Sequence, residues 1–165
     1  MDLAKTGIAS GSHMSIHLRQ HHGLPAKQLD ESLNRHSGLL GVSGVLSDFR
    51  EVEKAATAGH PRARLALDLF ADRIRTKIGE LAVTLGGVDA LIFTAGIGEH
   101  SAALRNRVCD GLQCLSLALD EAKNQESLTD SDIASVPSAG RILLIRTREE
   151  QEIARASQVF CAGLR

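Results

Sequence analysis

Two glycines follow an apolar run in the middle of the chain, where LIFT (91–94) is followed by AGIGE (95–99). The run is typical of a buried parallel strand, and a helix is predicted after it, from about residue 102 to residue 112. Glycine lets the backbone approach a ligand closely at the end of a strand, where helix-start N–H groups can donate to that ligand. A nucleotide suits this edge of a parallel sheet. The alternative is that Gly96 and Gly98 only make the turn, because neither GxGxxG nor a phosphate-loop motif is present.

Charged residues also stand at the start of an earlier predicted helix. The segment consists of Ser47, Asp48, Phe49 and Arg50. Its side chains could bind a ribose, a phosphate or the edge of a base. The alternative is a helix cap with solvated charges, in which Ser47 is the N-cap and Asp48 lies in the first turn.

Glu149 and Glu150 follow RILLIR (141–146), a second buried-strand pattern, and open the last predicted helix. A carboxylate at this place could help to hold Mg²⁺, usually through water molecules, because the ion keeps much of its hydration shell. The alternative is that both carboxylates only interact favourably with the positive end of the helix dipole.

Histidines and cysteines offer weaker candidates for a metal site. His17 and His21 have the i, i+4 spacing of two ligands on one helical face, but the absence of an HExxH motif favours solvated histidines. Cys109, Cys114 and Cys161 lack the spacing of a zinc finger and do not form a disulfide framework. They are predicted to be small buried thiols in a reducing compartment.

The helices that must position these residues follow from periodicity and from helix-ending signals. Helices are expected from Ser15 to Gly23, from Pro25 to Gly38 and from about Asp48 to Gly59, with tight turns in the glycine-rich segment 39–45. The longest helix is predicted over 61–85, because apolar residues recur there every three or four positions. These residues are Leu67, Phe70, Ile74, Ile78, Leu81 and Leu85. The stripe is interpreted as a core or subunit-packing surface.

The second half of the chain alternates strands and helices. Strands are predicted over 88–94 and 141–146, with a weaker one at 115–119 where leucines alternate. Residues 121–140 are polar and are predicted to form a surface loop, and the last helix is predicted to begin near residue 149. The order indicates an α/β fold with a mainly parallel sheet.

Composition excludes several classes of protein. The 19 Lys and Arg against 20 Asp and Glu give a formal net charge of −1, whereas nucleic-acid-binding proteins usually have a basic excess. Trp and Tyr are absent, so aromatic platforms for stacked bases are not expected. No apolar run approaches the roughly 20 residues of a membrane helix, and the start of the chain lacks a signal-peptide pattern. We therefore expect a cytoplasmic protein without a nucleic-acid or membrane partner.

Three segments, in order and with suitable spacing, resemble the acetate/propionate kinase family, and acetate kinase in particular. They are SGLLGVSGVLSDFREV (37–52), DALIFTAGIGEHSAALRNRVCDGL (89–112) and RTREEQEIAR (146–155). The resemblance implies an actin-like, sugar-kinase-type (RNase H-like) ATPase domain, with long helices packed on the sheet, and a homodimer. Residues 15–165 correspond to the C-terminal part only. Residues 1–14 are interpreted as a leader, because GSHM (11–14) resembles the remnant of a cleaved affinity tag; the alternative is a native loop.

The resemblance implies two groups of nucleotide contacts and one metal contact. The first group contacts the adenosine portion of ATP and consists of Asp48, Phe49 and Arg50. The second forms another nucleotide loop and consists of Gly96, Ile97, Gly98, Glu99 and His100. His100 departs from the family, which usually has Asn there. Glu149 matches the glutamate associated with Mg²⁺, although Gln151 replaces the leucine that follows the family's glutamate pair.

The resemblance also implies that the groups contacting acetate and the transferring phosphoryl lie outside this chain. Phosphoryl transfer depends mainly on positioning and on electrostatic stabilisation of the transferring group. We therefore expect no catalytic residues here and an isolated chain that is inactive in converting ATP and acetate to ADP and acetyl phosphate. The alternatives are a propionate kinase fragment and a non-catalytic nucleotide-binding or dimerisation module.

Overall fold

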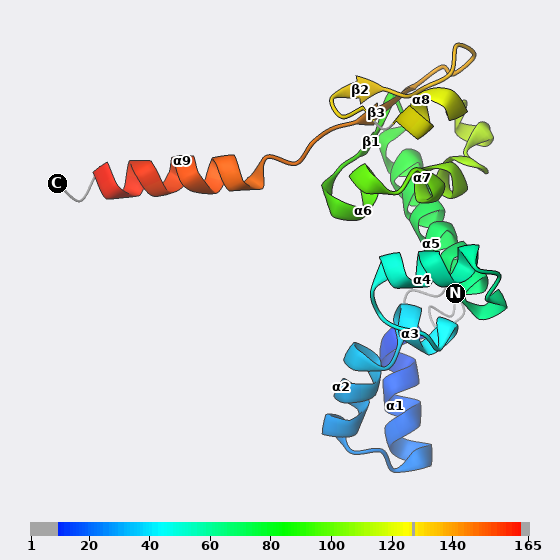
Figure 1. Ribbon diagram of the computed structural model, residues 1–165. Helices are drawn as coiled ribbons and strands as arrows, with labels where there is room; N and C mark the ends of the chain where they lie inside the picture. Colours follow the sequence, from blue (N-terminus) through cyan, green and yellow to red (C-terminus); the bar gives the residue numbers. More distant parts are fainter. Residues whose placement is uncertain (1–9, 127, 163–165) are drawn as a thin grey trace. The chain divides into compact units, whose positions relative to one another are not determined.

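The computed structural model describes residues 10–126 and 128–162, and the chain divides into two compact units, residues 1–67 and residues 68–165 (Figure 1). In its described residues the first unit is helical, whereas the second combines a small sheet with helices. Helix α1 (Ser10–His22) begins inside the segment interpreted as a leader, and residues 1–9 of that segment lie outside the described residues.

The first unit continues with short helices that place apolar side chains on one face. They are α2 (Ala26–Arg35), α3 (Gly38–Ser43) and α4 (Phe49–Thr57), and α5 (Pro61–Leu85) begins here. Leu29 is the buried residue of α2. Helix α4 buries Phe49, Val52 and Ala56, which recur at the three- and four-residue spacing of one helical face. The predicted helices at these places are confirmed, with bounds shifted by a few residues.

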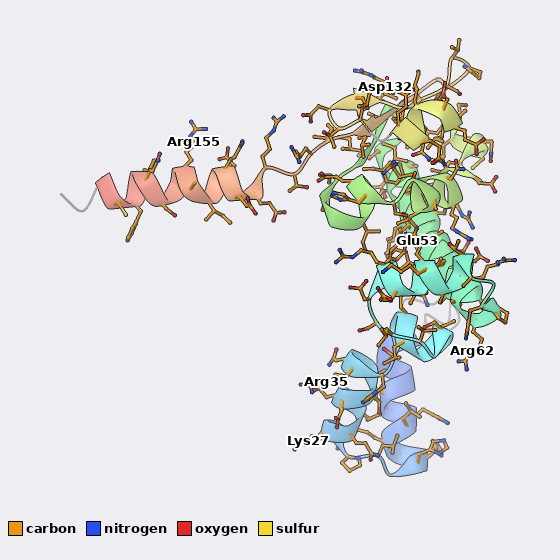
Figure 2. All side chains as sticks on the ribbon, viewed as in Figure 1. Lys27, Arg35, Glu53, Arg62, Asp132 and Arg155 are labelled. Atoms are coloured by element: carbon orange, nitrogen blue, oxygen red, sulfur yellow. The ribbon has the colours of Figure 1, made fainter. Side chains whose placement is uncertain are left out.

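The glycine-rich segment 39–45 is mostly helical, so the prediction of tight turns throughout it is wrong. Gly44 ends α3 in the left-handed region at φ 69°, which glycine adopts without a steric penalty. Arg62, labelled in Figure 2, donates from Nε to the carbonyl of Val42 (2.9 Å) and from Nη2 to that of Gly41 (3.1 Å). These carbonyls lie at the end of α3, where helical carbonyls lack intrahelical partners, so a distant side chain supports this short helix.

The second unit contains a three-stranded sheet in the order β1-β3-β2. Strands β1 (Ala90–Phe93) and β3 (Arg141–Leu144) pair in parallel, so the predicted parallel pairing is confirmed. The prediction that both strands are buried is wrong for β1, in which Phe93 is buried and Ile92 is exposed. Strand β2 (Ser131–Asp132) pairs antiparallel to β3, which makes the sheet mixed. Asp132, labelled in Figure 2, accepts from Arg141 Nε at 2.9 Å and from the N–H of Ala134 at 3.0 Å. These hydrogen bonds lower the pKa of Asp132 and fix the short strand.

The weaker strand predicted at 115–119 is wrong. The 3₁₀ helix η2 (Gln113–Leu115) occupies its start, and Ser116 follows in the left-handed region at φ 57°. A left-handed residue interrupts the extended backbone that alternating leucines suggested. Leu117 is nevertheless fully buried, and Leu119 forms an isolated antiparallel bridge with Ala134.

The polar segment 121–140, expected to be a surface loop, is also more ordered than its composition suggests. It contains helix α8 (Glu121–Glu126) as well as β2. Asp120 supports the start of α8, because its Oδ1 accepts from the N–H of Lys123 at 3.1 Å. Asn124 of α8 is fully buried.

Helix α5 spans the whole predicted length, but its apolar stripe is buried unevenly. Leu67 is buried, whereas Leu81 and Leu85 have exposed fractions of 58% and 77%. Near the middle of α5, Arg75 donates from Nη1 to the carbonyls of Arg107 and Asp110, both at 2.8 Å. These carbonyls lie at the end of α7, so Arg75 links α5 to α7.

Three further helices complete the second unit. They are α6 (Ala95–His100), α7 (Ala102–Cys109) and α9 (Glu149–Ala162). Ser101 separates α6 from α7 and caps α7, because its Oγ accepts from the N–H of Leu104 at 3.0 Å. No helix in the described residues has the length and apolarity to cross a membrane.

Cys109 of α7 is buried as predicted, and burial raises the pKa of its thiol to about 12. Cys114 and Cys161 are exposed, so the prediction of buried thiols is wrong for these two.

Candidate functional site

Two threonines join the carboxyl ends of the parallel strands. Thr94 follows β1 directly, and Thr147 follows β3 after two residues. Their hydroxyl oxygens are 2.8 Å apart, and the N–H of Ala95 donates to Thr147 Oγ1 at 2.7 Å. The hydroxyl of Thr147 therefore receives the first backbone N–H of α6, a group that has no partner within the helix.

Glu99 completes this network from the other end of α6. Its Oε1 accepts from the N–H of Thr147 and from Thr147 Oγ1, both at 2.8 Å. The backbone and side-chain hydrogen bonds of Thr147 lower the pKa of Glu99, because they stabilise the charged carboxylate. Glu99 is 8% exposed and therefore faces the protein rather than solvent. The network fixes the turn between β1 and α7.

The predicted glycine loop is a helical turn, α6. Ala95, which precedes the glycines, has φ 62°, a left-handed conformation that costs a residue with a Cβ about 1 kcal/mol or more. A Cβ at Gly96 would meet no atom within 4 Å, so the space beside this backbone is open. His100 Nδ1 lies 2.8 Å from the carbonyl oxygen of Gly96. Gly96 and Ile97 are exposed, and they form the accessible side of the turn.

The segment from Asp48 to Arg50 belongs to residues 1–67. Asp48, and not Ser47 as predicted, is the N-cap of α4, and its Oδ1 accepts from the N–H of Arg50 at 2.8 Å. Phe49 is 6% exposed and packs in the core, whereas the Arg50 side chain is 84% exposed. The structure thus makes the Arg50 side chain accessible to a ligand and uses Asp48 to cap the helix.

Glu149 and Glu150 lie exposed in the first turn of α9. They line, with residues 129–130 and 146–148, an open cavity of about 610 Å³. Arg148 Nη2 and Asp130 Oδ2 form an ion pair at 2.7 Å beside it. In the described part of the chain no group of three or more His, Cys, Asp and Glu side chains could hold a metal ion. A single carboxylate still suits Mg²⁺, which binds through one or two carboxylates, water and substrate phosphates.

Thr94, Thr147 and Arg105 contribute to this region but were not among the predicted site residues. Thr94 is the last residue of one predicted strand and Thr147 directly follows the other, and this placement was a usable signal in the sequence. Arg105 had no such signal, because a charged residue in a helix is normally exposed. The structure buries it completely.

Glu99→Gln is expected to reduce the pH dependence of stability in the acid range. The pKa of Glu99 in the folded chain lies below its ordinary value of 4.5. The carboxylate therefore contributes stability above that value, and the contribution is lost as pH falls through the lower folded pKa. Urea unfolding measured from about pH 7 to about pH 3 should give the wild-type chain a larger free energy of unfolding than Glu99→Gln. This difference should shrink below pH 4.5. Glu150→Gln is the control, and a Glu99→Gln difference that stays constant with pH would contradict the expectation.

Comparisons with known proteins identify the family of this chain. Residues 7–155 match the model of the Acetokinase family. The chain is 49% identical over 152 residues to the acetate kinase of Cyanothece sp., covering 90% of this chain and 37% of that relative. It is 53% identical over 140 residues to the propionate kinase of Citrobacter rodentium, and this match covers 84% of this chain and 34% of that relative.

A solved structure extends the similarity to three dimensions. The crystal structure of Porphyromonas gingivalis acetate kinase matches with a TM-score of 0.78 and 35% identity, over 89% of this chain and 37% of that one. The predicted fold class, part of an actin-like ATPase domain, is therefore confirmed. The chain spans a little over a third of the length of these relatives. It belongs to the acetokinase family.

Proposed function

We propose that this chain is the C-terminal nucleotide-binding and dimerisation part of an acetate kinase, which converts ATP and acetate to ADP and acetyl phosphate. The observation that carries the proposal is the Thr94–Thr147–Glu99 network, which fixes a glycine-containing turn at the carboxyl ends of two parallel strands. This edge of a parallel sheet is where α/β proteins bind nucleotides.

The residues of the turn divide into two roles in this proposal. Gly96, Ile97 and His100 are exposed and would form the side of α6 that the nucleotide approaches. Gly98 carries the turn close to β1, since a Cβ there would lie 3.6 Å from the carbonyl carbon of Phe93. Glu99 is buried and would hold the turn in place without contacting the nucleotide.

The adenosine contact is proposed for Asp48, Phe49 and Arg50. Because Phe49 is buried and Asp48 caps α4, their side chains would set the backbone position. The exposed guanidinium of Arg50 is the group of this segment that can reach a ligand.

Glu149 is proposed to help hold Mg²⁺ beside the cavity at the start of α9. The donor set fits a hydrated ion, since a single exposed carboxylate leaves most coordination positions to water and to phosphate oxygens. When bound, the ion neutralises negative charge on the phosphates.

Glu149→Gln is expected to weaken binding of ATP about tenfold in the presence of Mg²⁺, and to leave binding without Mg²⁺ unchanged. Calorimetric titration of the chain with ATP measures both affinities. The matched control is Glu150→Gln, which removes a neighbouring carboxylate from the same exposed turn. Equal effects of the two substitutions would contradict the role of Glu149, and no binding of ATP to the wild-type chain would overturn the proposed nucleotide site.

We further propose that the isolated chain does not transfer the phosphoryl group. It spans a little over a third of its relatives' length, and phosphoryl transfer needs every group that orients acceptor and phosphate. A hydroxamate assay with acetate or propionate as acceptor should show no turnover above background. Turnover would overturn this expectation, and a preference between the two acids would distinguish an acetate kinase from a propionate kinase.

The alternative is a non-catalytic dimerisation module. It is favoured by exposed apolar side chains on α5 and β1, namely Leu81, Leu85 and Ile92, because such surfaces promote association. Sedimentation at several concentrations separates a dimer from a monomer. A dimer that fails to bind ATP would support the alternative over the nucleotide-binding proposal.

A further inference from the structure

Arg105 of α7 is fully buried, and its guanidinium contacts the end of α6. Nη1 donates to the carbonyl oxygens of Gly98 at 2.8 Å and of Glu99 at 2.9 Å. Burial lowers the pKa of Arg105, because desolvation disfavours the charged form. Burying a charged guanidinium destabilises the folded chain unless hydrogen bonds compensate the lost hydration. These hydrogen bonds therefore stabilise Arg105 in its buried position.

Asn124 of α8 holds the other side of the guanidinium. Its Oδ1 accepts from Arg105 Nε at 2.6 Å, and its backbone carbonyl accepts from Nη2 at 3.0 Å. The Asn124 amide also donates from Nδ2 to the carbonyl of Ala102 at 2.9 Å, at the start of α7. Asn124 is fully buried as well. Helix α8, in the segment that composition marked as a loop, thus fixes the position of the guanidinium.

The two carbonyls that Arg105 binds are among the last of α6. The final carbonyls of a helix lack intrahelical partners, and a cation there interacts favourably with the helix dipole. A helix of six residues is not stable alone, because one turn fixes many dihedral angles for few hydrogen bonds. Thr147 binds the first N–H of α6 and the Glu99 side chain, and Arg105 binds the last carbonyls.

We propose that Arg105 and Asn124 are positioning residues for α6, which hold its backbone in the conformation that the nucleotide meets without themselves contacting the nucleotide. The nucleotide part rests on the proposed function, whereas the effect on the α6 backbone does not. The planar guanidinium reaches two carbonyls on one side and Asn124 on the other, which a lysine ammonium on a flexible stem cannot reproduce.

Arg105→Lys and Asn124→Ala test the proposal in the 165-residue chain. Hydrogen–deuterium exchange followed by mass spectrometry should show exchange at residues 95–101 that is at least tenfold faster than in the wild type. Exchange in α5 and β3 should change by less than threefold. Calorimetry should show about tenfold weaker binding of ATP. Arg107→Met is the control, because Arg107 lies on the same helix but forms its ion pair with Asp68 of α5.

Each outcome decides the proposal. Unchanged exchange at residues 95–101 overturns it, and so does equally accelerated exchange throughout residues 68–165, which would make Arg105 a general stabiliser. Faster local exchange with unchanged ATP affinity keeps the effect on the backbone and overturns its link to the nucleotide. If the wild-type chain binds no ATP, the proposed function fails while the exchange result still tests the role of Arg105.

If both variants fail to fold, native-state hydrogen exchange in the wild-type chain tests whether Arg105 holds α6. At rising urea concentrations, the amides of Glu99, His100 and Ser101 should open together with those of α7 and α8. Opening of α6 at clearly lower urea would show that the buried guanidinium does not hold it, and would overturn the proposal.

Discussion

Replacing Gly140 with alanine is expected to cost about 3 kcal/mol or more of the unfolding free energy of the second unit. A Cβ at this position would lie 2.7 Å from Leu117 Cδ2, 2.9 Å from the carbonyl oxygen of Val88 and 3.2 Å from that of Asp89. The leucine can rotate away, but the carbonyl of Asp89 accepts from the N–H of Arg141 at 2.9 Å and is part of the parallel pairing. The alanine would therefore push β1 and β3 apart at their first hydrogen bond.

Urea unfolding followed by circular dichroism measures this loss, and the buried thiol of Cys109 gives a second readout because it reacts only when the unit opens. The control is Gly79→Ala in α5, where a Cβ would meet no atom within 4 Å. That substitution should stabilise the chain by about 0.5–1 kcal/mol, since alanine favours a helix interior over glycine. Similar effects of the two alanines would contradict the proposed crowding at Gly140.

Thr147→Val is expected to lower the unfolding free energy by about 1–3 kcal/mol and the affinity for ATP about tenfold. Valine keeps the shape of threonine but removes the hydroxyl that accepts from Ala95 and donates to Glu99. The pKa of Glu99 should rise toward its ordinary value, because only the backbone N–H of Thr147 remains as donor from this residue. Urea unfolding, NMR titration of Glu99 and calorimetry measure the three effects.

The matched control is Thr84→Val on α5, whose hydroxyl donates to the carbonyl of Glu80 within the same helix. An exposed hydroxyl of this kind contributes little, so stability should change by less than about 0.5 kcal/mol. Wild-type affinity for ATP in Thr147→Val would show that the network does not position a nucleotide site. Loss of stability equal to that in Thr84→Val would show that the hydroxyl of Thr147 is dispensable.

The features predicted correctly are those that local pattern determines. The apolar runs around Phe93 and Ile142 predicted the parallel pair β1 and β3, because continuous apolar segments are typical of parallel strands. The expected burial holds for Ile142 and Leu144 of β3, whereas Ile92 of β1 is exposed. The stripe from Leu67 predicted α5 over its whole length, since periodicity over many turns is a strong signal. The segments that resemble acetate kinase correctly indicated the family.

The features that were missed depend on contacts between distant residues. Ser116 adopts a left-handed conformation that leucine alternation cannot reveal, and this changed a predicted strand into a 3₁₀ turn. Arg105 and Asn124 read as ordinary polar residues, because their burial exists only once α7 and α8 pack together. The burial of Glu99 depends in the same way on Thr147, 48 positions later in the sequence.

This separation along the chain has a consequence for the order of folding. The residues of α6 precede Thr147 by about 50 positions, and loops of that length close only after local structure has formed. We therefore expect the glycine turn to reach its final form late, once β3 has paired with β1 and brought Thr147 to Ala95 and Glu99. During synthesis on the ribosome, a nascent chain that ends before Thr147 would have the complete AGIGE motif without the hydroxyl that fixes it.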